Sequence, residues 1–166
     1  MTSIAVASNN EKLEHCKTLG SFASINYKEE PDFGKKVMEL TEGKGVNMIF
    51  DPVLGGNHFS QNISVLALEA RWVVFGTLGG GAVENINMAP ILSKRASIRG
   101  STLKTRSNEY KKDLIKSVAD NCVPLFKDGK FGYNIHKEFK LSEVHEAHKL
   151  VETNTTTGKV IMINDL

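Results

Sequence analysis

Two short glycine turns each follow an apolar, strand-like run of the chain. The first turn spans residues 51–56 (Asp-Pro-Val-Leu-Gly-Gly) and the second spans residues 76–81 (Gly-Thr-Leu-Gly-Gly-Gly). Glycine lets a backbone approach a ligand closely, and open parallel sheets bind ligands outside the carboxyl ends of their strands. The two turns therefore predict a dinucleotide-binding domain. Because no G-x-G-x-x-G precedes them, we expect the sequence to begin after the turn that normally binds pyrophosphate.

Polar residues follow the first strand-like run, where a nucleotide-binding domain usually selects its cofactor. An acidic side chain in this place binds the adenosine ribose hydroxyls of NAD, but here the residues are Ser8, Asn9 and Asn10. Hydroxyl, amide and lysine donors would instead hold a 2′-phosphate, and Lys12 and Tyr27 are candidates to reach it. The same residues also fit a plain turn followed by a solvated lysine, and the spacing leaves both interpretations open.

Short apolar runs alternate with amphipathic segments along the first two thirds of the chain. We expect strands at residues 4–7, 22–27, 46–50, 71–75 and 96–100. Helices are expected between them, with Asn9 or Asn10 capping the first, Asp32 capping the second, and further helices over residues 58–66 and 88–94. Strands joined by crossover helices indicate an α/β fold with a doubly wound parallel sheet.

The last third begins with a long amphipathic segment. The spacing predicts a helix over residues 107–126 that Pro124 limits or kinks. The residues expected to face inward are apolar and share one helical face: Tyr110, Leu114, Val118 and Leu125.

The end of the chain has a strand-helix-strand pattern. The strands are expected at residues 134–141 and 159–163, with Ser142 capping the helix between them.

The composition is that of one soluble globular domain. The chain has 166 residues, of which 40% are hydrophobic and 24% are charged, and its net charge is +2. This balance indicates neither nucleic acid nor a membrane surface as a partner, and no apolar run approaches the roughly 20 residues that span a bilayer. Cys16 and Cys122 are expected as buried thiols in a reducing cytoplasm, and the five histidines form no metal-ligand set.

Several segments, taken in order, resemble the cofactor half of the zinc-independent quinone oxidoreductases of the medium-chain dehydrogenase/reductase superfamily. The resemblance covers nearly the whole chain, and the segments that carry it are residues 7–13, 19–20, 25–30, 43–51, 68–76, 79–81, 146–149 and 158–160. It implies a Rossmann-like fold and hydride transfer from NADPH to a quinone or another electron-poor carbonyl or alkene. It also implies that NADPH, not a metal, is the cofactor.

The resemblance assigns roles to particular residues. The positions that match the 2′-phosphate site are Ser8, Asn9, Lys12 and Tyr27. The positions that match the backbone beside the ribose and near the nicotinamide are Asp51, Gly55, Gly76, Thr77 and Leu78. A further segment matches the lining of the nicotinamide pocket, although ending a strand is an equal alternative for it: Ser101, Thr102 and Leu103.

The sequence also departs from this family. The GroES-like catalytic domain, the first Rossmann strand, its glycine-rich turn and the first helix are missing, so we expect a fragment that binds NADPH weakly by itself. The missing strand is central in the usual order. Its removal would separate the strand at residues 4–7 from the strand at residues 46–50, or force the two to pair directly.

The family fold divides the chain at residue 130. Residues 1–130 would form a partial NADPH-binding domain, and residues 131–166 would form a tail that returns to the catalytic domain. Without that domain, the final strand is expected to be an exposed edge. Family dimers pair near residues 98–103, so a homo-oligomer through that edge is expected. The alternative function is a noncatalytic interaction module built on the truncated fold.

Overall fold

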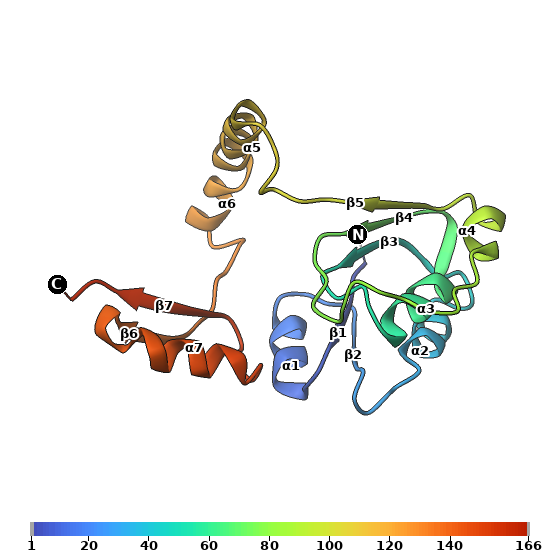
Figure 1. Cartoon of the computed structure of the whole chain (residues 1–166), viewed down its shortest axis with the longest axis horizontal. Helices are drawn as coiled ribbons and strands as arrows, with labels where there is room; N and C mark the ends of the chain where they lie inside the picture. Colours follow the sequence, from blue (N-terminus) through green and yellow to red (C-terminus); the bar gives the residue numbers. More distant parts are fainter. Residues whose placement is uncertain (1, 166) are drawn as a thin grey trace. The chain divides into compact units, whose positions relative to one another are not determined.

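The computed structural model describes residues 2–165 and contains two compact units, Met1–Asn108 and Glu109–Leu166 (Figure 1). The elements of the first unit are β1 (Ile4–Ala7), α1 (Asn10–Thr18), β2 (Ala23–Asn26), α2 (Phe33–Leu40), β3 (Val46–Asp51), α3 (Asn57–Ser64), β4 (Leu66–Val74), α4 (Ala89–Ser93) and β5 (Ser97–Gly100). The expected division at residue 130 concerns the domains of the complete family fold and stays a prediction.

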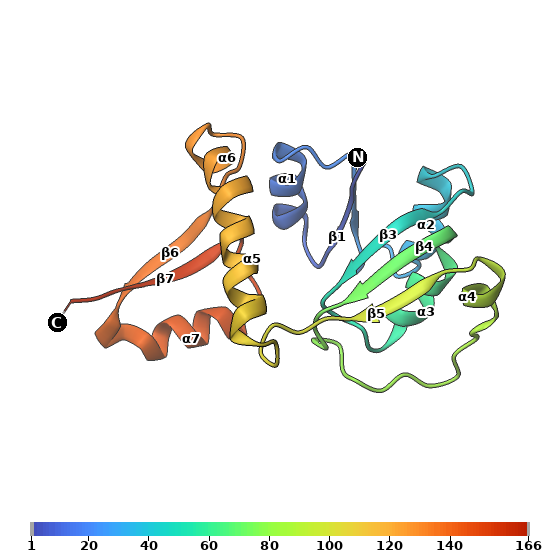
Figure 2. The ribbon, with the colours of Figure 1, turned by 90° about the horizontal axis from the view of Figure 1, so that it is seen from above.

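All strand pairs of the first unit are parallel, which confirms the expected α/β class. One sheet contains β1 and β2, and a second contains β3, β4 and β5 in that order. Figure 2 shows β3, β4 and β5 side by side, with β1 outside this sheet. Of the two arrangements expected without a central strand, the structure therefore has the separated one.

Side-chain caps start the first two helices as the sequence predicts. The Asn9 side chain accepts a hydrogen bond from the Lys12 backbone N–H at 2.9 Å, and Asp32 accepts one from Lys35 at 3.1 Å. Each cap satisfies one of the backbone donors that have no partner inside the helix. These two positions fix where α1 and α2 begin.

The third helix and the fourth strand differ from expectation. The helix expected over residues 58–66 ends at Ser64, and Leu66 already belongs to β4, which begins five residues before the expected strand. The Val46 N–H donates to the Val65 carbonyl at 2.8 Å, and the register with β3 shifts between Val46 and Met48. Because of this pairing, Leu66, which was expected to end the helix, lies in the sheet.

Two apolar clusters form the core of the first unit. One contains Phe33 and Val37 of α2 together with Ile25 and Val65, and Ile4 of β1 and Ile49 of β3 pack against it. Helix α2 therefore contributes to a cluster that reaches both sheets. The second cluster contains Phe59, Ile63 and the fully buried Trp72, which joins α3 to β4.

The second unit begins at the second residue of α5 (Asn108–Asn121) and continues with α6 (Val123–Lys127), β6 (Ile135–Lys140), the 3₁₀ helix η1 (Leu141–Glu143), α7 (Val144–Glu152) and β7 (Lys159–Ile163). The long helix is interrupted at Cys122, just before Pro124, which confirms the expected limit.

The expectation that α5 turns Tyr110, Leu114 and Val118 inward is wrong. These side chains are exposed, no residue of α5 is buried, and Leu125 in α6 is only half-buried. Helical spacing reveals an apolar face but contains no information about what covers it.

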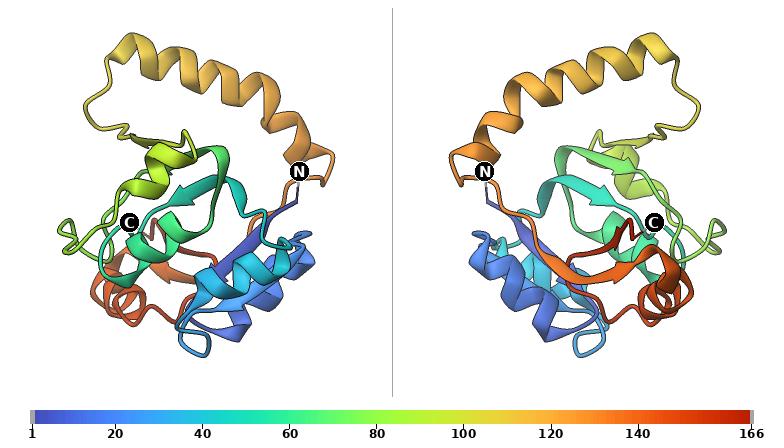
Figure 3. Two further views of the ribbon diagram at one scale, coloured as in Figure 1. Left: turned by 90° about the vertical axis from the view of Figure 1, so that its right-hand side faces the viewer. Right: turned by 90° about the vertical axis from the view of Figure 1, so that its left-hand side faces the viewer.

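The last strand also has a partner that was not expected. β7 pairs in parallel with β6, and α7 packs against both strands (Figure 3). One edge of each strand is thereby satisfied, and Phe139 and Ala147 are the buried apolar residues among the described part of this unit.

Two smaller expectations in the chain need correction. Ser142 does not cap α7, because its hydroxyl lies 3.0 Å from an Asp165 carboxylate oxygen and forms a hydrogen bond with it. Cys16 and Cys122 are free thiols that are half-buried instead of fully buried.

Within residues 2–165, no helix has the length and apolar character that crossing a membrane requires.

We predict that Phe59→Ala lowers the free energy of unfolding by about 3 to 5 kcal/mol, because it leaves a cavity against Trp72. The two rings lie 4.7 Å apart between centroids, and Phe59 is buried. Urea denaturation measures the change. Phe22→Ala is the matched control, because that ring is 63% exposed and its loss should cost less than about 1 kcal/mol. Equal losses would contradict the packing described here.

Candidate functional site

The expected site residues lie at the carboxyl ends of the parallel strands of the first unit. Ser8 follows β1, Tyr27 follows β2, and Asp51 ends β3. The residues after β4 and β5 complete the set: Gly76, Thr77, Leu78, Ser101, Thr102 and Leu103. Parallel sheets bind their ligands at this edge, so the topology brings together residues that are far apart in sequence.

The carboxylate of Asp51 organises the end of β3. One oxygen accepts hydrogen bonds from the backbone N–H groups of Val53 at 2.7 Å and Leu54 at 2.9 Å. The other accepts from the Asn62 amide and the Trp72 indole, both at 3.1 Å. Asp51 is only 3% exposed, so this side chain holds the first glycine turn, α3 and β4 together and does not point into solvent.

The two glycine turns pack on each other, backbone against backbone. The N–H of Leu78 donates to the Pro52 carbonyl at 3.1 Å, and the N–H of Gly79 donates to the Val53 carbonyl at 2.8 Å. A Cβ added at Gly55 would overlap the Gly79 carbonyl, and one added at Gly76 would lie 2.6 Å from the Pro52 oxygen. These two glycines are therefore required by the contact between the turns, a reason that the sequence did not reveal.

A shallow cleft of about 500 Å³ lies beyond the ends of β4 and β5. It brings together four of the expected site residues, Gly76, Thr77, Ser101 and Thr102. Thr105 and Arg106 also line it, and neither was expected there. The donors of the cleft are backbone amides, hydroxyls and one guanidinium, a set that suits polar and anionic groups of a ligand.

Two of the expected residues point elsewhere. The side chains of Leu78 and Leu103 are 85% and 55% exposed, and neither lines this cleft. Residues 94–106 include several basic side chains, and the structure places two of them differently. Arg106 lies in the cleft, whereas Arg95 forms an exposed ion pair with Glu69 at 3.1 Å.

The expected 2′-phosphate residues surround the start of α1. Ser8 is buried, and the side chain of Asn9 is used as the helix cap. Lys12 lies in the first turns of α1 and is half-buried. The Tyr27 ring contacts the His58 ring edge-on at 5.0 Å between centroids, which fixes its position beside α3.

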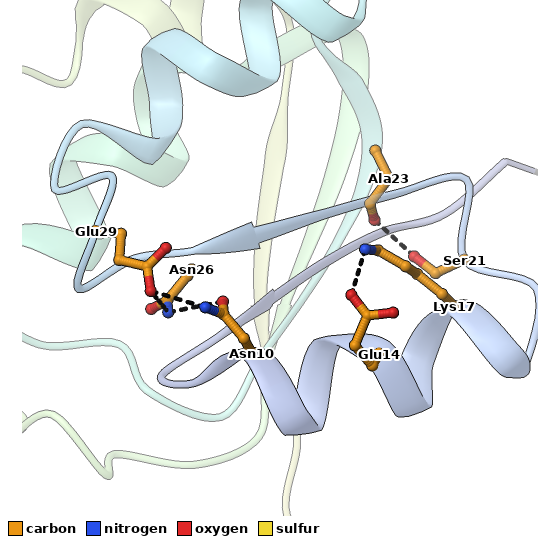
Figure 4. A network of polar contacts seen from close by, with 7 residues as sticks. All are labelled: Asn10, Glu14, Lys17, Ser21, Ala23, Asn26 and Glu29. Atoms are coloured by element: carbon orange, nitrogen blue, oxygen red, sulfur yellow. Dashed lines mark hydrogen bonds and ion pairs between the residues drawn. The ribbon is translucent and has the colours of Figure 1, made fainter.

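A carboxylate lies beside this corner, although none was expected from the residues that follow β1. An oxygen of Glu29 accepts hydrogen bonds from the side-chain amides of Asn10 at 2.8 Å and Asn26 at 2.9 Å (Figure 4). The Asn26 amide also donates to the Asn10 side-chain oxygen at 3.0 Å. Sequence reasoning missed this group because Glu29 is 19 residues from Asn10 and reaches the corner only through the β1–β2 pairing.

Metal-ligating side chains do not gather in the described chain. Within residues 2–165, no group of three or more His, Cys, Asp or Glu side chains could hold a metal ion.

Comparison with known proteins places the chain in a family. Residues 2–120 match the family described as "Zinc-binding dehydrogenase". The chain belongs to this family. It is a member of the medium-chain dehydrogenase/reductase superfamily related to quinone oxidoreductases, and it corresponds to their carboxyl-terminal half. The resemblance inferred from the sequence is thereby confirmed.

A curated relative is the "Quinone oxidoreductase-like protein 2 homolog" of Nematostella vectensis. It is 32% identical over 157 residues, which are 94% of this chain and 42% of the relative. The chain spans about half the length of the curated relatives it matches.

Solved structures share the fold. An NAD-dependent alcohol dehydrogenase superposes with a TM-score of 0.79 at 28% identity, over 98% of this chain and 44% of that protein. A quinone oxidoreductase of Escherichia coli, solved in complex with NADPH, superposes with a TM-score of 0.78 at 21% identity, over 98% of this chain and 49% of that protein.

We predict that Asp51→Asn lowers the free energy of unfolding by about 2 to 4 kcal/mol, because the new amide presents a donor to groups that are themselves donors. Chemical denaturation followed by Trp72 fluorescence measures this loss. Asp32→Asn is the matched control, because asparagine caps a helix as well as aspartate does. An unchanged stability of the Asp51 variant would show that its four hydrogen bonds do not hold the site together.

Proposed function

We propose that this chain forms the cofactor-binding half of an NADPH-dependent quinone oxidoreductase. The observation that carries the proposal is the cleft beyond β4 and β5, where four residues expected at the nicotinamide end come together. The relationship to quinone oxidoreductases supports the same function. The substrate would be a small quinone or another electron-poor carbonyl or alkene.

The two ends of the cofactor would meet different parts of the strand edge. Thr77, Ser101 and Thr102 line the cleft and would orient the nicotinamide ring with hydroxyl and backbone groups. Lys12 and Tyr27 would hold the adenosine 2′-phosphate at the other end. A bound NADPH would supply the hydride, and the protein would orient the cofactor and exclude water.

We expect the two ends of NADPH to meet more binding groups of this chain than its middle does. The backbones of Gly55 and Gly79 lie so close together that a Cβ added at Gly55 would overlap the Gly79 carbonyl, so this part of the two turns is used for internal packing. The described residues contain no G-x-G-x-x-G turn leading into a helix, the arrangement that binds pyrophosphate most effectively. We therefore expect NADPH to bind this chain weakly, with the 2′-phosphate supplying a large share of the affinity.

The preference for NADPH over NADH depends on two opposite charges near α1. Lys12 favours the 2′-phosphate, whereas the Glu29 carboxylate, held by Asn10 and Asn26, disfavours it electrostatically. The alternative, a noncatalytic interaction module, predicts binding of neither cofactor. Titration calorimetry of the purified chain with NADPH and with NADH separates these cases.

We predict that Lys12→Gln weakens NADPH binding about tenfold and leaves NADH binding unchanged, because it removes a charged hydrogen-bond donor. Calorimetry with both cofactors measures the difference. Lys17→Gln is the matched control on the same helix, because Lys17 is exposed and pairs with Glu14. Equal affinity of the unmodified chain for both cofactors would contradict the 2′-phosphate assignment, and no heat with either would contradict cofactor binding.

We predict the opposite effect for Glu29→Gln. The glutamine amide oxygen can still accept from Asn10 and Asn26, but the negative charge is gone, so NADPH should bind about twofold to fivefold more tightly. The neighbouring Glu30 is also exposed, and Glu30→Gln should change NADPH affinity less. The gain should fall as salt is added, because screening weakens the repulsion that the variant removes. If the Glu29→Gln variant also bound NADH more tightly, the cause would be a change in the shape of the binding site and not the removal of the negative charge.

A further inference from the structure

The cleft beyond β4 and β5 has an uneven charge. Its polar side chains are four hydroxyls and one guanidinium: Thr77, Ser101, Thr102, Thr105 and Arg106. Among the described residues, no Asp or Glu lines it. The lining therefore carries one positive charge and no negative charge. Such a lining attracts an anion, and the hydroxyl groups can add hydrogen bonds to it.

The backbone places Arg106 at this cleft. The Ser101 N–H donates to the Val74 carbonyl at 2.8 Å, which continues the pairing of β5 with β4. The Arg106 N–H then donates to the Leu103 carbonyl at 3.2 Å and closes a turn. Arg106 is half-buried, whereas residues 101–105 are exposed. Because solvent and salt screen a half-buried charge less than an exposed one, Arg106 would bind an anion more strongly than a surface arginine would.

A guanidinium suits a carboxylate in shape and charge. Its planar N–H groups can bind both oxygens of a carboxylate at once. It has five N–H donors, so Arg106 can keep a contact within the chain and still bind a ligand. A phosphate monoester carries close to two negative charges at pH 7, whereas a carboxylate carries one. The single positive charge of the cleft therefore matches a carboxylate.

The position of Arg106 does not suit the charged groups of the cofactor. In the proposed orientation the 2′-phosphate lies near Lys12 on α1, and the nicotinamide lies in the cleft. Strands β1 and β3 contribute to the same apolar cluster around Phe33, whereas β4 separates β5 from β3. The nicotinamide carries no negative charge, and its oxidised ring is positive. A positive charge beyond β5 therefore fits an anionic group of the second substrate.

We propose that the substrate reduced at this cleft carries a carboxylate conjugated with its electron-poor alkene, and that Arg106 binds this carboxylate. The inference rests on the proposed function and narrows its substrate class to α,β-unsaturated carboxylates. The alkene carbon β to the carboxylate would receive the hydride of NADPH. The α-carbon would receive a proton from water, which leaves hydroxide. The C=C π bond breaks, two C–H bonds form, and the products are the saturated carboxylate and NADP⁺.

The same contact would assist the reaction. As the hydride adds to the β-carbon, the π electrons move toward the carboxylate and increase its negative charge. A guanidinium that is already in place stabilises this charge without rearrangement of solvent.

The test is an NMR titration of the full chain with two small probes of similar shape, crotonate and the uncharged crotonamide. Each is added with and without NADP⁺, which cannot donate a hydride, so binding is measured without turnover. We expect crotonate to shift the amide signals of Ser101, Thr102 and Arg106. It should bind about tenfold more tightly than crotonamide, because it alone forms a charged hydrogen-bonded pair with the guanidinium. Added salt should reduce this difference.

Variants of two arginines isolate the contact. Arg106→Gln should remove the preference for crotonate and leave NADP⁺ affinity unchanged. Arg95→Gln is the matched control, because Arg95 forms an exposed ion pair with Glu69 and does not line the cleft. It should bind crotonate as the unmodified chain does. Arg106→Lys keeps the charge without the planar donors, so its crotonate affinity should lie between the two. The amide spectra show whether each variant folds, and the lysine variant serves if Arg106→Gln does not.

Two results would overturn the proposal. Equal affinity of the unmodified chain for crotonate and crotonamide would contradict a carboxylate site. A loss of NADP⁺ affinity in Arg106→Gln would assign Arg106 to the cofactor phosphates instead.

Failure of the proposed function has a different signature. In that case NADP⁺ would shift no signals near Lys12 or Thr77. The titrations without cofactor would then still decide the site: a preference for crotonate that requires Arg106 would support it, and no preference would contradict it.

Discussion

One buried carboxylate holds the candidate site in place. Asp51 accepts four hydrogen bonds, two from the turn that follows it and two from side chains of α3 and β4. The turn so fixed supplies the Pro52 and Val53 carbonyls on which the second glycine turn docks. The second turn in turn lines the cleft beyond β4 and β5. The position of the cleft therefore depends on a buried carboxylate whose two oxygens accept hydrogen bonds from other groups of this chain.

The second constraint is that a parallel sheet needs both edges of each inner strand to be paired. Within the described part of the first unit, β1 pairs with β2 and β3 pairs with β4, so the strands form two sheets and not one. The apolar cluster around α2 contacts both parts, with Ile4 on one side and Ile49 on the other. Side-chain packing thus keeps the two sheets together, although β1 and β3 are not hydrogen-bonded to each other. The hydrophobic effect that drives this packing is non-directional, whereas a hydrogen bond requires a particular geometry.

Local patterns predicted the elements well and their partners poorly. Asn9, Asp32 and Pro124 mark helix boundaries because caps and prolines act within a few residues. The apolar face of α5 was recognised, yet Tyr110 and Leu114 are exposed, since the pattern does not identify a covering partner. The placement of Asp51 and Gly55 beside a ribose stays a prediction, and their internal contacts, which depend on the second glycine turn, α3 and β4, were not visible in the local pattern. The network of Glu29, Asn10 and Asn26 depends on strand pairing and was missed for that reason.

The sequence by itself determined the α/β class, the caps of α1 and α2 and membership in the dehydrogenase family, because each depends on residues close together in the chain or on segments matched in order. Tertiary structure alone decided that β1 and β3 stay apart, that Glu29 reaches α1 and that β7 pairs with β6. These features depend on which backbone edges find partners across long sequence separations, and no local pattern encodes that choice.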